Sequence, residues 1–190
     1  CRVGSECLAE RKMRGIIRNK RVRDYINVLA DAVIATYKIE IPISNIDKVV
    51  NEMGGTIITP PDFDELCDGT IKKDGNFFEI MLSVNQSDNR RTFTIAHELG
   101  HLFLHMGYRT NSEVWKHQSE QVYSRFGTSE QEYQANEFAA ALLMPKKEYE
   151  QYIQRIVSGD KVNMQKVADH FHVSKLAAIN RGRFLGLIRN

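Results

Sequence analysis

Two histidines and a glutamate at fixed spacing are the residues of this sequence best suited to chemistry. His97, Glu98 and His101 stand within the stretch Arg90–Met106. On a helix, side chains four residues apart lie one above the other, about 6 Å apart, so both imidazoles could present a nitrogen to one metal ion. Glu98 follows His97 directly and could reach a water molecule on that ion without being a ligand. The three residues therefore predict two metal ligands and a general base around one point.

The stretch Arg90–Met106 has the apolar pattern of an amphipathic helix, and Asp88 or Asn89 is expected to cap it. Its apolar residues recur mostly at three- and four-residue steps: Phe93, Ile95, Ala96, Leu99, Leu102, Phe103 and Met106. Two imidazoles on the buried face of such a helix are costly unless they bind something. The His-Glu-x-x-His pattern on a helix, typical of zinc peptidases, is therefore more probable here as a metal site than as a chance match.

Length and composition indicate one large domain, or one domain with a small appendage. The chain has 190 residues, of which 42% are hydrophobic and 26% charged, and its net charge of +2 does not argue for nucleic-acid binding. No apolar run approaches the ~20 residues of a membrane span. The three cysteines (Cys1, Cys7 and Cys67) are odd in number and lack CxxC spacing, which argues against disulfides and cysteine zinc sites. We expect a cytoplasmic protein without membrane contact.

The elements around the motif predict an α+β fold. A short strand is expected at residues 55–59, and a hairpin of strands 69–73 and 76–84 is expected to turn at Asp74-Gly75. Further helices are expected at 21–38, 46–53 (capped by Ser44), 131–143 and 146–157. Residues 107–128 have no clear pattern and could be a lid or a poorly marked helix. The expected organisation is a basic N-terminal extension at 1–20, a metal-binding domain at 21–157 and a helical region at 160–190.

The helical region has the pattern of a helix-turn-helix, with a tight turn at His172-Val173 and a second helix from Ser174. Three apolar residues, Leu176, Ala177 and Ala178, stand where a DNA-recognition helix would be polar and basic. Packing on the core or on a partner is therefore favoured over direct DNA binding through residues 162–188. The basic N-terminal extension is likewise expected to be a solvated terminus in preference to a nucleic-acid arm.

A catalytic zinc ion needs a third protein ligand and one open position. His105 lies about 12 Å along the helix from the first histidine, too far to share one ion. Glu132 is a better candidate, because Asn136, one turn further on, could hydrogen-bond a ligand imidazole. Ser129 and Glu132 also match a capping box, in which Glu132 would only bond the helix start. The spacing leaves both interpretations open, and His117 remains a further candidate.

Two motifs of this chain, HELGHLFLH and EYQANEFAAALLMP, resemble those of the ImmA/IrrE-type zinc metallopeptidases of the cytoplasm. The resemblance covers about residues 25–157 and implies a small thermolysin-like, or gluzincin-like, core of a few-stranded sheet and the motif helix. It implies one zinc ion per chain held by His97, His101 and Glu132, with Glu98 as the catalytic glutamate. Gln134 stands where members of the family often carry glutamate, outside this ligand set.

The resemblance also implies a function, namely a zinc metalloendopeptidase that cleaves a helix-turn-helix repressor or antitoxin partner and so relieves repression. The alternatives are a transcription regulator and a repressor-sequestering protein, in which the zinc site is sensory or non-proteolytic. A peptidase would also need a donor for the oxyanion. Tyr108, His117 and Tyr123 are the candidates, and the sequence does not choose among them.

Overall fold

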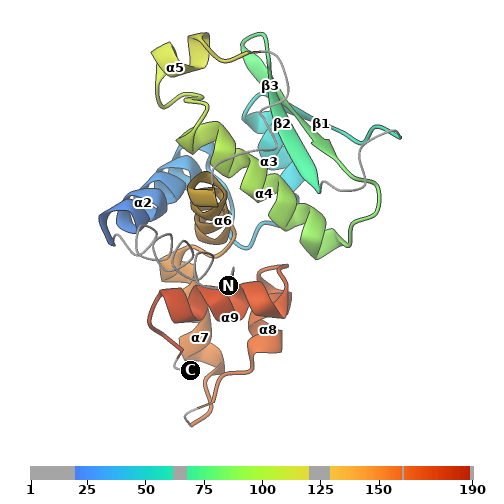
Figure 1. The fold of residues 1–190 in the computed structure, drawn as a ribbon. Helices are drawn as coiled ribbons and strands as arrows, with labels where there is room; N and C mark the ends of the chain where they lie inside the picture. Colours follow the sequence, from blue (N-terminus) through green and yellow to red (C-terminus); the bar gives the residue numbers. More distant parts are fainter. Residues whose placement is uncertain (1–19, 62–67, 120–128, 160, 189–190) are drawn as a thin grey trace, which may run out of the picture.

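The computed structural model describes residues 20–61, 68–119, 129–159 and 161–188 of the chain. Its elements, in chain order, are α2 (Lys20–Tyr37), α3 (Ile46–Glu52), β1 (Gly55–Ile58), β2 (Gly69–Asp74), β3 (Phe77–Leu82), α4 (Asp88–Leu104), α5 (Ser112–Lys116), α6 (Ser129–Leu143), α7 (Lys146–Ile156), α8 (Met164–His170) and α9 (Lys175–Phe184). The fold is α+β, as predicted: α4 lies between a small sheet and helices α2 and α6, and α3 packs on the sheet beside β1 (Figure 1). None of the described helices is both long and apolar enough to cross a membrane.

The sheet has three strands in the order β1-β3-β2, with β3 parallel to β1 and antiparallel to β2. The predicted hairpin is confirmed, although its two-residue turn is Gly75-Asn76, flanked by the Asp74–Phe77 pair. Gly75 adopts a φ of +57°, the left-handed region that such a turn requires and glycine allows. The alternating residues Phe78, Ile80 and Leu82 of β3 are buried, so one face of the sheet packs on the core.

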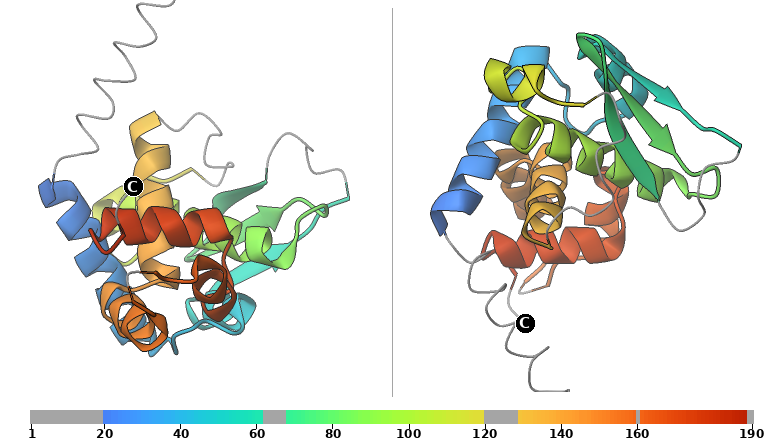
Figure 2. Two further views of the ribbon diagram at one scale, coloured as in Figure 1. Left: turned by 90° about the horizontal axis from the view of Figure 1, so that it is seen from below. Right: turned by 45° about the horizontal axis from the view of Figure 1, so that its top comes forward.

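Helix α4 is buried on several faces, because it packs against the sheet on one side and against α6 on the other (Figure 2). Helix α4 lies close to the backbone of α6 at Gly100. A Cβ atom placed there would lie only 2.9 Å from both the Cα and the carbonyl oxygen of Ala135. The absence of a side chain at Gly100 therefore sets how closely the two helices approach each other.

The C-terminal helices pack on the same core through apolar residues such as Val167 and Ala178 and through Arg181 of α9, a buried arginine that is only 2% exposed. Its Nε donates to the carbonyl oxygen of Met144 at 2.9 Å, and its two terminal nitrogens donate to Glu137 at 3.1 Å and to Asn27 at 2.8 Å. The hydroxyl of Tyr149 adds a bond to the carbonyl oxygen of Ala178 at 2.6 Å. Helix α9 is thereby bonded to α2, α6 and α7.

Most element boundaries agree with the predicted ones, and the differences lie at helix starts and strand ends. Ser87, and neither Asp88 nor Asn89, precedes α4 as its N-cap. Asn45 caps α3 in place of Ser44, and its side chain accepts from the Lys48 amide. Several polar residues of capping type stand side by side at both starts, so the pattern did not distinguish them.

Two predictions about the remaining segments are resolved by the described residues. Part of the patternless region 107–128 forms the short helix α5, and residues 120–128 lie outside the described residues. The predicted turn at His172-Val173 is present, with His172 at a φ of +53°, and Ser174 caps α9 by accepting from the Ala177 amide. The C-terminal region is therefore a pair of helices joined by a tight turn.

Candidate metal centre

Two helices bring His97, His101 and Glu132 together. Helix α4 supplies both imidazoles from adjacent turns, and α6 supplies the carboxylate, where it crosses α4. The two Nε2 atoms are 3.1 Å apart, and the Glu132 oxygens lie 3.2 Å from Nε2 of His97 and 3.3 Å from Nε2 of His101. Ligand atoms placed about 2 Å from a tetrahedral ion are about 3.3 Å apart. The three side chains thus bring their ligand atoms close enough together to hold one metal ion.

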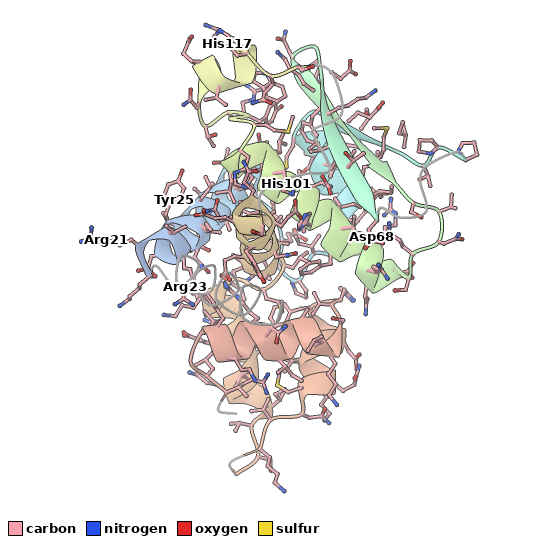
Figure 3. The ribbon with its side chains drawn as sticks, viewed as in Figure 1. Arg21, Arg23, Tyr25, Asp68, His101 and His117 are labelled. Carbon is pink, nitrogen blue, oxygen red and sulfur yellow. The ribbon has the colours of Figure 1, made fainter. Side chains whose placement is uncertain are left out.

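The structure distinguishes the three candidates for the third ligand, which are Glu132, His105 and His117. Both oxygens of Glu132 face the imidazoles, which favours a ligand role over the capping box with Ser129. His105 ends α4, and its Nε2 contacts the carbonyl oxygen of Gln131 at 3.3 Å. His117 directly follows α5 as its C-cap, away from His101 (Figure 3), with its Nδ1 2.8 Å from the carbonyl oxygen of Glu113. Glu132 is the candidate that the fold brings to the histidine pair.

Asn136 lies beside the first histidine. Its Oδ1 is 3.0 Å from Nδ1 of His97. An amide oxygen only accepts, so this contact is a hydrogen bond in the tautomer that carries the proton on Nδ1, which leaves the lone pair of Nε2 facing His101 and Glu132. This hydrogen bond fixes the ring and its tautomer, the support that metal-binding imidazoles need.

The His101 imidazole is kept neutral by its surroundings. Burial lowers its pKa to about 3, and the neighbouring rings of His97 and His105 act in the same direction. Since a metal ion accepts only an unprotonated ring nitrogen, His101 is ready to bind across the neutral and mildly acidic range.

Glu98 is 6% exposed, and its carboxyl lies beside the first residue of β2. A Cβ atom at Gly69 would approach Glu98 Oε1 to 3.5 Å and Thr94 Cγ2 to 2.5 Å, so glycine leaves room for this carboxyl. Burial, and secondarily the negative charge of Glu132, raises the pKa of Glu98 to about 8. A carboxyl in this environment is a much stronger base than one in water.

The predicted oxyanion donors are not assembled at this centre by the described residues. The hydroxyl of Tyr108 is buried and donates to the carbonyl oxygen of Met53 at 2.6 Å. His117 is the C-cap of α5, and Tyr123 lies outside the described residues.

Two features near the centre were not predicted from the sequence. One is the close contact between Gly100 and Ala135. The other is a pair of side-chain hydrogen bonds at the start of α4, in which Arg90 donates to Asp68 at 2.6 Å and Thr94 donates to Gln86 at 3.0 Å. The contact at Gly100 could have been predicted, because a glycine within a strongly helical pattern indicates a close packing partner. The residues of the two hydrogen bonds follow no sequence pattern that would have predicted those bonds.

Comparison with known proteins agrees with this geometry. The Peptidase_M78 family model, described as an IrrE N-terminal-like domain, matches residues 67–182. The chain belongs to this family. The matched region includes α8 and most of α9, so the family domain continues beyond the residues 25–157 covered by the motif resemblance.

One solved structure, described as a Mycobacterium tuberculosis transcriptional regulator, matches with a TM-score of 0.58 and 15% identity. The match covers 85% of this chain and 50% of that chain, so this chain spans about half the length of its structural neighbour. At this identity the likeness shows a shared fold alone. No curated protein matches this chain.

Proposed function

We propose that this protein is a zinc-dependent endopeptidase that cleaves a helix-turn-helix repressor or antitoxin and so relieves repression. The observation that carries the proposal is the cluster of His97, His101 and Glu132, in which the two Nε2 atoms and the two carboxylate oxygens make contacts of 3.1–3.3 Å, with the buried Glu98 next to His97 in the sequence. A site that only stabilised the fold would not need a carboxyl kept basic beside its ligands.

The donor set suits zinc. Two neutral imidazoles and one carboxylate are the ligands of known catalytic zinc sites, which keep a fourth position open. Held by His97, His101 and Glu132, zinc would supply Lewis acidity towards a peptide carbonyl and make water a usable nucleophile near neutral pH. Asn136 holds the His97 ring in the tautomer that this role requires.

Glu98 is the proposed general base and acid. Its carboxylate takes a proton from the attacking water at one oxygen and later passes it to the amine that leaves. Burial favours the protonated form once the proton has been accepted, which suits the second half of this task. No other charged side chain has to move a proton in this scheme.

The partner is proposed from the family, whose members act on helix-turn-helix regulators in the cytoplasm, and we propose the same location here. The description of the structural neighbour as a transcriptional regulator supports a regulatory setting. The most direct candidate for the substrate is a small helix-turn-helix protein encoded beside this chain.

The test compares wild-type protein with Glu98→Gln. Each is purified, assayed for zinc by elemental analysis, and incubated with the candidate partner, whose fragments are identified by mass spectrometry. We expect both proteins to hold about one zinc ion per chain and only the wild type to cut. If Glu98→Gln relieves repression in cells as fully as the wild type, the protein sequesters its partner and the proteolytic proposal is wrong.

A further inference from the structure

A groove of about 520 Å³ lies where α2, α6 and α9 meet, beside the candidate metal centre. This volume is within the range of clefts that bind small ligands or short peptide segments. Large apolar and aromatic side chains line it: Val22 and Ile26 of α2, Phe93 of α4, Tyr133 of α6, and Leu176 and Phe184 of α9. Leu176 is 64% exposed and Tyr133 47% exposed, so the groove walls present apolar surface to solvent.

The groove is continuous with the metal centre. Asn136, which contacts the His97 ring, is itself a lining residue. Phe93 lies one helical turn before His97, and Asn136 lies one turn after Glu132. One turn of helix rises about 5.4 Å, whereas an extended peptide rises about 3.3 Å per residue. A side chain two or three residues from a peptide bond held at the metal centre would therefore reach the groove.

The charges of the groove cancel. Two of its lining residues are cations, Arg23 and Arg181, and two are anions, Glu130 and Glu137. Arg181 and Glu137 pair with each other at 3.1 Å, and Arg23 lies over the Phe184 ring at 4.9 Å. Figure 3 shows Arg23 near the end of α2 that faces α9. Nucleic acid requires an excess of positive charge, so these walls favour an uncharged, apolar polypeptide segment.

We propose that this groove binds an apolar side chain of the substrate, two or three residues from the bond that is cut. Helix α9 is then a wall of the substrate-binding site, and its residue Leu176 contacts the substrate where a DNA-recognition helix would contact bases. This proposal rests on the proposed peptidase function, since it takes the position of the cut bond from the metal centre.

The test uses two hydroxamates, which bind zinc and are not cleaved. Each carries a two-residue peptide, one ending in leucine and the other in aspartate, and acetohydroxamic acid reports on the metal centre alone. Binding to the zinc-loaded wild type is measured by calorimetry. We expect the leucine probe to bind at least about 10-fold more tightly than the aspartate probe, because burial of one large apolar side chain supplies that difference.

Two variants of matched exposure locate the effect. Leu176→Asp places a charge on the groove wall, and Val28→Asp places one on α2 outside the groove, at a side chain that is 66% exposed. Leu176→Asp should weaken the leucine probe about 10-fold or more without changing acetohydroxamic acid, and Val28→Asp should change neither. Circular dichroism checks that both variants are folded. Equal binding of the two peptide probes, or equal losses in the two variants, would overturn the proposal.

Failure of the metal centre, on which the peptidase proposal depends, would appear separately, as a lack of acetohydroxamic acid binding, and failure of proteolysis would appear in the Glu98→Gln comparison. In that case N-acetyl-leucine amide and N-acetyl-aspartate amide are titrated into isotope-labelled protein. Shifts in the resonances of Leu176 and Tyr133 with the leucine compound alone would preserve the groove as an apolar binding site. The absence of those shifts would overturn it.

Discussion

Replacement of Gly100 by alanine tests whether the spacing of α4 and α6 sets the metal centre. The added Cβ would lie 2.9 Å from backbone atoms of Ala135, whereas carbon atoms in contact are about 3.5–4.0 Å apart. Neither backbone can turn away as a side chain would, so the helices must separate by roughly 0.6 Å or more. Because metal ligands tolerate errors of only about 0.2 Å, Glu132 should no longer match the two histidines.

The expected stability change follows from two opposing effects. Overpacking against rigid backbone costs up to about 3 kcal/mol, and alanine is favoured over glycine inside a helix by about 1 kcal/mol. We expect a net loss of about 2 kcal/mol in the free energy of unfolding, or about 4–8 °C in Tm for a chain of this size. Misplacement of the third ligand should lower zinc affinity about 10- to 100-fold, the loss typical of disturbed metal sites.

The assay combines thermal denaturation of the metal-free protein with zinc titration against a competing chelator. Gly75→Ala is the control, because Gly75 has a positive φ but no atom near its Cβ position. It should lose about 1 kcal/mol through backbone strain and keep its zinc affinity. If Gly100→Ala is destabilised but binds zinc like the wild type, the α4–α6 spacing does not set the ligand geometry, and the reasoning fails.

Three further predictions concern single charged side chains. Glu132→Ala should lose most bound zinc in elemental analysis, whereas Glu130→Ala should keep it; equal retention would return Glu132 to a capping role. Glu98 has a pKa of about 8 against an ordinary value of 4.5, so its ionisation destabilises the folded metal-free protein increasingly as pH rises between these values. Glu98→Gln should therefore stabilise the metal-free protein more at pH 8 than at pH 5, by a difference on the order of 3 kcal/mol in the free energy of unfolding, and a pH-independent difference would contradict this. Arg181→Met should lower the free energy of unfolding by about 3–5 kcal/mol, because it leaves the buried Glu137 carboxylate without its cationic partner, and the loss should be larger at pH 7 than at pH 5. Denaturant unfolding of the double variant Arg181→Met, Glu137→Gln should show that part of this stability is restored.

Features that depend on neighbouring residues were predictable from the sequence. The motif helix follows from the apolar period of Arg90–Met106, and the hairpin follows from a turn signal between two extended runs. The same is true of the His97–His101 pair, since one helix determines its spacing. These predictions needed no knowledge of what packs against each element.

Features that depend on distant packing were not predictable. The pattern from Ser129 to Glu132 is compatible with a cap and with a ligand, and only the crossing of α4 and α6 turns the carboxylate towards the imidazoles. The groove is likewise assembled from elements far apart in the chain, and no local pattern of Leu176 or Phe184 indicates which surface they face. Hydrophobic periodicity identifies the buried face of an element but does not identify the partner that covers it.

The bond from Arg181 to Asn27 joins residues separated by 154 positions in the chain. Contacts of such long range form only after the intervening chain has been made, because loop closure must come before they can stabilise anything. During synthesis the motif helix and its two histidines leave the ribosome well before α9. The groove wall formed by α9 is then still missing, so under the proposed function a nascent chain of this protein would not yet bind an apolar substrate segment. Selective binding would thus begin only when α9 has docked, which separates the time of metal-site assembly from the time of the proposed substrate recognition.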